Sequence, residues 1–170
     1  DTVDGLGASW DRERALRIMR TGDVGPMGVS ALIIVLLIDV FALSMLLRTW
    51  SGTTLVVLAM ASSRLALPWA CLPRVPSARP DGLGAAVAGS VRPWVAVVET
   101  AALMAAGIGV AAATGGRPWF AALVPLGGLA VTGILLRHCS RRLGGITGDV
   151  LGALVECAFA ASLVVAVLVT

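Results

Sequence analysis

The chain has 170 residues, of which 58% are hydrophobic and 14% are charged, and its mean hydropathy is +0.93. A soluble domain carries about 25% charged residues, so this composition is typical of a membrane protein. The net charge is +3, and the thirteen basic residues, all arginines, do not form one basic face with interleaved aromatic residues, which argues against a nucleic-acid-binding protein.

The chain opens with an acidic, glycine-rich stretch, DTVDGLGA at positions 1–8. Asp1 and Asp4 are three residues apart, so on a helix they would share a face and could hold a divalent ion. A solvated turn before a helix is the alternative. Because the chain begins inside this acidic stretch and without methionine, we expect the protein's true N-terminus to lie upstream.

Residues 9–21, SWDRERALRIMRT, predict a short amphipathic helix. Ser9 or Asp11 can cap its start. Its apolar side consists of Ala15, Leu16, Ile18 and Met19. The arginines on its other side would meet the headgroups of membrane lipid or an anionic substrate. We therefore expect an interfacial helix on the inner membrane surface.

Five apolar stretches are long enough to cross a bilayer, which takes about 20 residues of helix. They are Val29–Leu47, Thr54–Leu72, Trp94–Ala113, Trp119–Leu136 and Val150–Thr170. Buried soluble helices are the alternative, but five such lengths in this chain make it improbable. The predicted fold class is all-α: a polytopic membrane helix bundle with five transmembrane helices and one interfacial helix, forming one domain over residues 1–170.

The arginines orient these spans. Ten of them precede the first span or lie in the two loops at residues 73–93 and 137–149, whereas the opposite side holds only Arg48 and Arg117. The positive-inside rule therefore places both loops, and Cys139 with them, on the cytoplasmic side of the cell membrane.

The sequence Asp-Gly-Leu-Gly-Ala occurs at residues 4–8 and 81–85, and a looser copy, DVLGA, occupies residues 149–153. Their aspartates, Asp4, Asp81 and Asp149, all fall on the predicted cytoplasmic side, where a helix bundle could bring them together. Glycines let backbone approach a ligand closely, and magnesium prefers carboxylate and phosphate oxygens. We therefore predict a magnesium–phosphate site on the cytoplasmic face.

Each loop also carries groups that could bind phosphate. Arg79 lies two residues before Asp81 and could neutralise phosphate charge, although an ordinary positive-inside loop is the alternative. In the second loop, glycines surround Thr147 just before a predicted helix start, where backbone amides can hold an anion. The run is not a Walker A motif, because no GK[ST] follows it.

Three acidic residues lie inside predicted spans: Asp39, Glu99 and Glu156. Each would cost about 2.5–3.5 kcal/mol if it faced lipid, so we expect all three to face the bundle interior. Arg64, also within a span, is a possible partner for Asp39 or Glu99. A small transporter that uses these three acids is a competing function of a different class.

Four segments resemble the cobalamin synthase family: DTVDGLGASWDRERALRIMR at 1–20, SSR at 62–64, ARPDGLG at 78–84 and RRLGGITGDVLGALVE at 141–156. The family consists of adenosylcobinamide-GDP ribazoletransferases, polytopic membrane enzymes of vitamin B12 assembly that carry a further N-terminal part. The resemblance implies that a hydroxyl of α-ribazole or its 5′-phosphate attacks the cobinamide-side phosphorus of adenosylcobinamide-GDP and releases GMP.

Magnesium is the cofactor that the resemblance implies. The predicted metal ligands are Asp1, Asp4, Asp81 and Asp149, with the last three as catalytic residues. The predicted substrate-binding residues are Arg79, Arg141, Arg142, Gly82, Gly84, Gly145, Thr147 and Gly148. The alternative enzyme is a CDP-alcohol phosphotransferase, which shares an Asp-x-x-Asp-Gly-x-x-Ala start; here Ser9 replaces its arginine and its downstream aspartates are missing.

Overall fold

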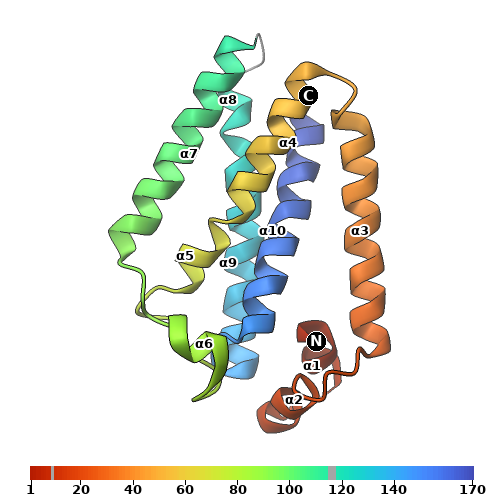
Figure 1. The fold of residues 1–170 in the computed structure, drawn as a ribbon, viewed down its shortest axis with the longest axis vertical. Coiled ribbons are helices and arrows are strands. Elements are labelled where there is room, and N and C mark those ends of the chain that lie inside the picture. Colours follow the sequence, from red (N-terminus) through yellow and green to blue (C-terminus); the bar gives the residue numbers. More distant parts are fainter. Residues whose placement is uncertain (9, 115–117) are drawn as a thin grey trace.

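The structure, a computed structural model, describes residues 1–8, 10–114 and 118–170 as a bundle of helices (Figure 1). Ser9 and Arg117, which entered the sequence analysis, lie outside the described residues. The helices are α1 Thr2–Ala8, α2 Arg12–Ile18, α3 Pro26–Leu46, α4 Trp50–Ser63, α5 Ala66–Ala70, α6 Gly82–Val87, α7 Pro93–Ala113, α8 Pro118–Ala121, α9 Leu123–Leu143 and α10 Gly148–Val169.

Five stretches of the described chain are helical, long and apolar enough to cross a membrane, which confirms the predicted fold class. They are Pro26–Leu46, Trp50–Ala70, Pro93–Ala113, Pro118–Leu143 and Gly148–Val169. The second span joins α4 to α5, and the fourth joins α8 to α9. The N-terminus lies at one end of the bundle and the C-terminus at the other, as an odd number of spans requires (Figure 1).

Helix α10 lies at the centre of the bundle and packs against α9, α4 and α3 (Figure 1). Its buried side repeats at helical spacing, with Val150, Leu154 and Ala158 each four residues apart. Helices α3 and α7 flank this centre. Large apolar side chains of α3, such as Leu32 and Phe41, are more than half exposed, as expected for a helix that faces lipid.

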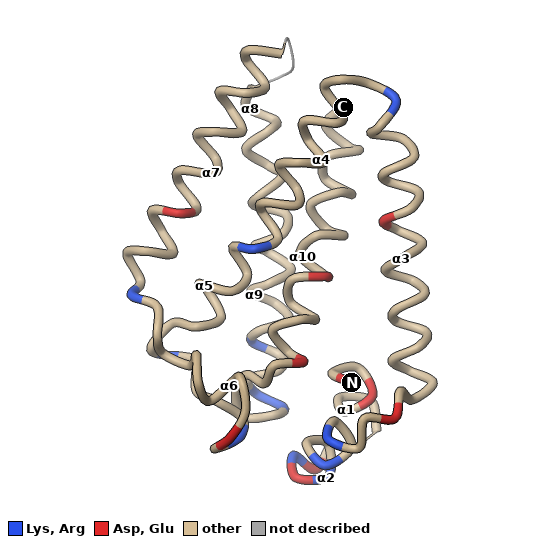
Figure 2. The backbone as a smooth tube through the Cα atoms, in the orientation of Figure 1, with Lys and Arg blue, Asp and Glu red and all other residues tan. Residues whose placement is uncertain are grey.

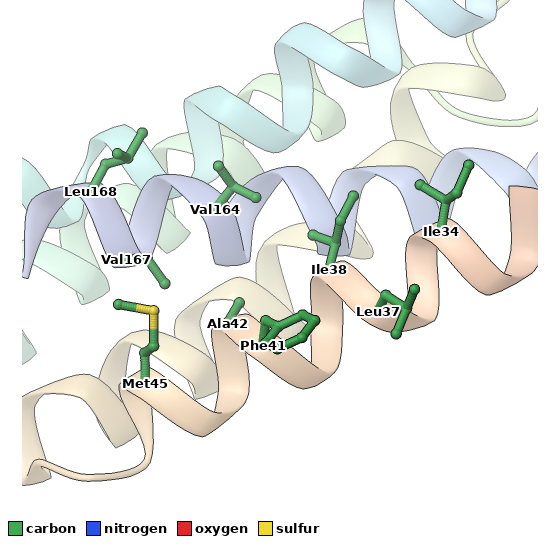
Figure 3. A pocket seen from close by; sticks show the side chains of 9 residues that line it. All are labelled: Ile34, Leu37, Ile38, Phe41, Ala42, Met45, Val164, Val167 and Leu168. Carbon is green, nitrogen blue, oxygen red and sulfur yellow. The ribbon is translucent and has the colours of Figure 1, made fainter.

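An apolar groove runs between α3 and the C-terminal half of α10, with a cavity volume of about 410 Å³ (Figure 3). Its lining residues are Ile34, Leu37, Ile38, Phe41, Ala42, Met45, Val164, Val167 and Leu168. Because none of these side chains is polar, the groove cannot hold a charged diphosphate and suits lipid chains instead.

Charged residues gather at the end of the bundle that carries α1, α2 and α6 (Figure 2). The helix predicted over residues 9–21 is shorter than expected. Helix α2 begins after Asp11, whose side chain caps it by accepting a hydrogen bond of 3.0 Å from the backbone N–H of Glu13. Ala15 and Met19 on its apolar side are buried, so the predicted amphipathic pattern does pack inward.

The loop predicted at residues 137–149 is mostly helix, because α9 continues to Leu143. Cys139 and Leu143 extend the buried side of α9 past the predicted end at Leu136, so the helix remains supported by packing. Gly144, with φ +81°, then ends the helix in the left-handed conformation. Cys139 is therefore a fully buried helical residue and not an exposed loop residue.

The expectation that all three intramembrane acids face the interior is wrong for two of them. Asp39 is buried, but Glu99 and Glu156 are exposed. Glu156 follows Gly152, which is also exposed, by one helical turn of α10. Hydrophobic cost alone predicted burial, but both side chains stay exposed, and Glu99 lines an open groove between α4 and α7.

Candidate functional site

The two loops at the charged end meet backbone to backbone. The N–H of Ala78 donates to the C=O of Ile146, and the N–H of Ile146 donates to the C=O of Pro76, both at 2.9 Å. These bonds form a short parallel bridge between Ser77 and Ile146. The start of α6 is thereby fixed beside the start of α10.

Glycines make this close contact possible. A Cβ on Gly145 would collide with the carbonyl of Pro76, and one on Gly84 would collide with the carbonyl of Ile146. Gly148 lies against the side chain of Leu83, at 3.5 Å from where its own Cβ would stand. Two glycines predicted to bind substrate, Gly84 and Gly145, are therefore required by the packing of the loops, whereas Gly148 has room for a Cβ.

Arginine side chains attach the α1–α2 segment to these loops. Nη2 of Arg12 donates to the C=O of Ala78 at 3.1 Å, and Nη2 of Arg79 donates to the C=O of Leu16 at 2.7 Å. The Arg79 side chain, predicted to bind phosphate, is thus directed toward α2. The contact of Arg12 was not predicted, because an arginine on an amphipathic helix is expected to bind lipid or substrate.

The other two predicted phosphate-binding arginines differ from each other. Nη2 of Arg142 donates to the C=O of Leu6 at 3.2 Å, and its guanidinium lies 4.0 Å from the centre of the Trp10 ring. Arg142 therefore holds α1 against α9. Arg141, on the same last turn of α9, is exposed and remains accessible to an anion at this end of the bundle.

Asp4 is buried, and its carboxylate points at the start of α3. Oδ2 accepts a hydrogen bond from the N–H of Gly25, and Oδ1 accepts one from the N–H of Gly28, both at 2.9 Å. Gly25 is the N-cap of α3, so Asp4 caps this helix from a distant part of the chain. A Cβ at Gly25 or Gly28 would collide with the carboxylate, which explains why glycine stands at both positions.

Asp81 and Asp149 flank the contact between α6 and α10. Asp81 precedes α6, is exposed, and has both carboxylate oxygens within 2.7 Å of Nη2 of Arg20 on the segment after α2. Asp149 lies half-buried in the first turn of α10. Thr147 caps that helix by accepting a hydrogen bond of 3.2 Å from the N–H of Val150. The role seen for Thr147 is therefore helix capping.

The four predicted metal ligands do not converge. The described residues include no group of three or more His, Cys, Asp or Glu side chains placed to hold one metal ion. Asp4 is turned to α3, and Asp1 is exposed at the chain start. Asp81 and Asp149 stand at the starts of α6 and α10.

Cys71 lies just before the loop of residues 73–93 and is buried. Burial raises the pKa of its thiol above the ordinary value, so the thiol stays protonated at neutral pH. Because the thiolate is the nucleophile, Cys71 does not supply one to this site.

Known proteins resemble this chain over most of its length. The family described as cobalamin-5-phosphate synthase matches residues 1–167. A protein named adenosylcobinamide-GDP ribazoletransferase from Frankia casuarinae is 43% identical over 97% of this chain and 62% of its own length. A protein of that name from a Nocardioides species is also 43% identical, over 96% of this chain and 61% of its length. A protein of that name from Bradyrhizobium diazoefficiens is 36% identical over 90% of this chain and 56% of its own length.

No solved structure matches the chain. The chain spans about three fifths of the length of the curated relatives it matches. It belongs to the cobalamin-5-phosphate synthase family, as its four motifs predicted.

Proposed function

We propose that this chain is part of an adenosylcobinamide-GDP ribazoletransferase, an enzyme that joins adenosylcobinamide-GDP to α-ribazole or its 5′-phosphate and releases GMP. Family membership and the names of the relatives support the reaction. The observation that carries the proposal is the junction of α6 and α10, where Asp81 and Asp149 flank a contact between loops. We place this junction on the cytoplasmic face of the cell membrane, because ten arginines lie at that end.

In this reaction a ribazole hydroxyl attacks the cobinamide-side phosphorus, and the bond from that phosphorus to the oxygen of GMP breaks. Such transfer depends mainly on positioning and charge neutralisation. Arg141 is exposed at the end of α9 and can bind a diphosphate oxygen. Arg79 and Arg142 support the site indirectly, because they fix α1 and α2 beside it.

Magnesium is proposed as the cofactor, with Asp81 and Asp149 as its ligands. When bound, it would neutralise charge on the diphosphate. Asp81 forms an ion pair with Arg20 in this structure, and magnesium would take the place of that guanidinium. Asp4, in contrast, is assigned to capping α3, since its two oxygens accept backbone N–H groups. Asp1 is exposed.

Neither alternative function is favoured. A transporter would use Asp39, Glu99 and Glu156 together, but Glu99 and Glu156 are exposed, whereas Asp39 is buried. A CDP-alcohol phosphotransferase lacks support from the family comparison.

The test is Asp149→Asn in the full-length protein, assayed by GMP release from adenosylcobinamide-GDP in detergent with magnesium. Asparagine keeps the size of the side chain but removes its charge. Loss of one strong electrostatic contact should lower turnover by about 10²–10³-fold. Unfolding temperature should barely change, because the residue is half-exposed at a helix start. Asp23→Asn, at an exposed residue before α3, is the control and should retain turnover. Near-normal turnover of Asp149→Asn would contradict the proposal.

A further inference from the structure

Two charged side chains of membrane spans, Arg64 and Glu99, line one open groove between α4 and α7. The groove has a cavity volume of about 440 Å³. Its other lining residues are Ala61, Leu65, Ala102, Leu103 and Ala106. Arg64 and Glu99 are both exposed. The groove therefore combines one cation and one anion with an apolar wall.

The two charges lie at matching positions along their spans. Arg64 is six residues before Ala70, where the α4–α5 span ends, and Glu99 is six residues after Pro93, where α7 begins. At 1.5 Å per residue, each lies about 9 Å inside the end of the bundle that carries α6. An arginine side chain can extend from this depth toward the interface. The groove is therefore within reach of headgroups in the leaflet at the charged end.

The fold of the second span places Arg64 at this position. The N–H of Arg64 donates to the C=O of Ala61 at 3.2 Å, and the N–H of Leu65 donates to the C=O of Ser62 at 3.0 Å. These bonds reach three residues back, so the span is interrupted by a tight turn at Arg64. Nearby, Nε1 of Trp69 donates to Oγ1 of Thr100 at 3.1 Å and holds α5 against α7.

Neither charge is neutralised by the described residues. Arg64 donates to the hydroxyl of Ser63 at 3.2 Å, and the side chain of Glu99 has no hydrogen bond or ion pair in the part of the chain that the structure describes. Arg64 and Glu99 are not within 4.0 Å of each other, although both line the groove. An uncompensated charge at this depth is costly, so each needs a partner from outside the described chain.

An apolar channel between α4 and α7 continues from the groove that Arg64 and Glu99 line. This second groove has a cavity volume of about 260 Å³ and shares Ala61, Leu103 and Ala106 with the first. Its walls extend to Thr54 on α4 and Ala111 on α7, toward the opposite end of the bundle. The two grooves together thus have the layout of a phospholipid: a charged head position that leads into a path for an acyl chain.

We propose that this groove binds a phospholipid with a zwitterionic amino headgroup, phosphatidylethanolamine. The phosphate oxygens accept hydrogen bonds from the guanidinium of Arg64, and the ammonium group donates to the carboxylate of Glu99. An acyl chain occupies the channel between α4 and α7. An anionic lipid would leave Glu99 facing negative charge. A choline headgroup has no N–H to donate to Glu99.

The experiment measures lipid binding to the detergent-purified full-length protein by native mass spectrometry and thermal unfolding. Equal amounts of phosphatidylethanolamine, phosphatidylcholine or phosphatidylglycerol are added. We expect phosphatidylethanolamine to be retained at least about three-fold more than the other two, and to raise the unfolding temperature. Arg64→Gln and Glu99→Gln should each remove this preference. Glu156→Gln, which removes an exposed acid of another span, should keep it.

Other results would overturn the proposal. Equal retention of the choline lipid would show that Glu99 does not bind the ammonium group. A preference for phosphatidylglycerol that depends on Arg64 alone would indicate an anion site. No retained lipid at all would show that protein covers the groove. If Arg64→Gln does not fold, Arg64→Lys keeps the charge, and retention of phosphatidylethanolamine by that variant supports the proposal while its loss in a folded variant contradicts it.

Discussion

Asp4→Ala is expected to destabilise the protein by releasing α1 from the start of α3. The Asp4 carboxylate accepts hydrogen bonds from the N–H groups of Gly25 and Gly28, both at 2.9 Å. Gly25 and Pro26 open α3 and offer no capping side chain of their own. Without Asp4, the N–H groups at the start of a membrane-spanning helix lose their partner at a buried site.

The structure sets the size of this effect. A hydrogen bond to a charged group contributes about 1.5–3 kcal/mol, and loss of a helix N-cap costs about 0.5–2 kcal/mol. Water can reach part of the cavity left by alanine and bond to the two N–H groups. The loss of stability should therefore be smaller than the sum for two hydrogen bonds. We expect Asp4→Ala to lower the free energy of unfolding by about 2–4 kcal/mol. For a domain of this size that corresponds to roughly 5–15 °C in unfolding temperature.

The cysteines provide the assay. Cys71 and Cys139 are buried, whereas Cys157 is half-buried, so in a Cys157→Ser background a thiol-reactive fluorophore that is bright only after reaction reports unfolding as the temperature rises. Asp23→Ala is the matched control, because it removes an exposed carboxylate two residues before Gly25. The control should unfold within about 2 °C of the wild-type protein, since exposed substitutions usually change stability by less than 0.5 kcal/mol.

Asp4→Asn separates capping from metal binding. Asparagine keeps one acceptor oxygen, so its unfolding temperature should fall between those of the wild-type protein and Asp4→Ala. If Asp4→Ala unfolded at the wild-type temperature, the capping argument would be refuted. If Asp4→Asn were as stable as the wild type and yet inactive, the carboxylate charge would serve the reaction. That result would support the prediction that Asp4 is a metal ligand.

Two further predictions concern the glycines and the orientation. Gly84→Ala should lower the unfolding temperature in the same assay, because its Cβ would collide with the carbonyl of Ile146, whereas Gly152→Ala should not, since no atom lies within 4 Å of its Cβ position. An equal effect of both would contradict the loop-packing role. His138→Cys, at an exposed residue of α9, should react with a membrane-impermeant thiol reagent only after cell lysis; labelling of intact cells would reverse the orientation.

The sequence predicted the membrane fold well, because span length and hydropathy depend on the bilayer and not on the details of packing. The prediction from sequence failed where side-chain packing determines the end of a helix or the burial of a side chain. The apolar pattern of α9 weakens among arginines after Leu136, yet Cys139 and Leu143 are buried and carry the helix onward. The same limit applies to Glu99, whose position on a helix surface depends on neighbours that a single sequence does not reveal.

The meeting of the two loops was predicted, but the contacts of their side chains were not. The sequence placed the glycine-rich loops at one end of the bundle, and the structure brings Gly84 and Gly145 into contact with the opposite loop. Sequence reasoning could not assign each arginine to its partner, because backbone carbonyls such as that of Leu16 give no sequence signal. Asp4 caps α3 by binding Gly25 and Gly28, which follow it by 21 and 24 positions in the chain. No local capping pattern describes contacts over such a separation.

The three Asp-x-Leu-Gly-Ala copies therefore have three different environments. Asp4 is bound by two backbone amides, and Asp81 is bound by Arg20, but the described residues give Asp149 neither a hydrogen bond nor an ion pair. Asp149 also lies in the first turn of α10, half-buried at the charged end of the bundle. Among the three repeated aspartates, its negative charge is thus the one most available to a ligand. If the family reaction takes place at this end of the bundle, Asp149 should be the most sensitive of the three to loss of charge alone.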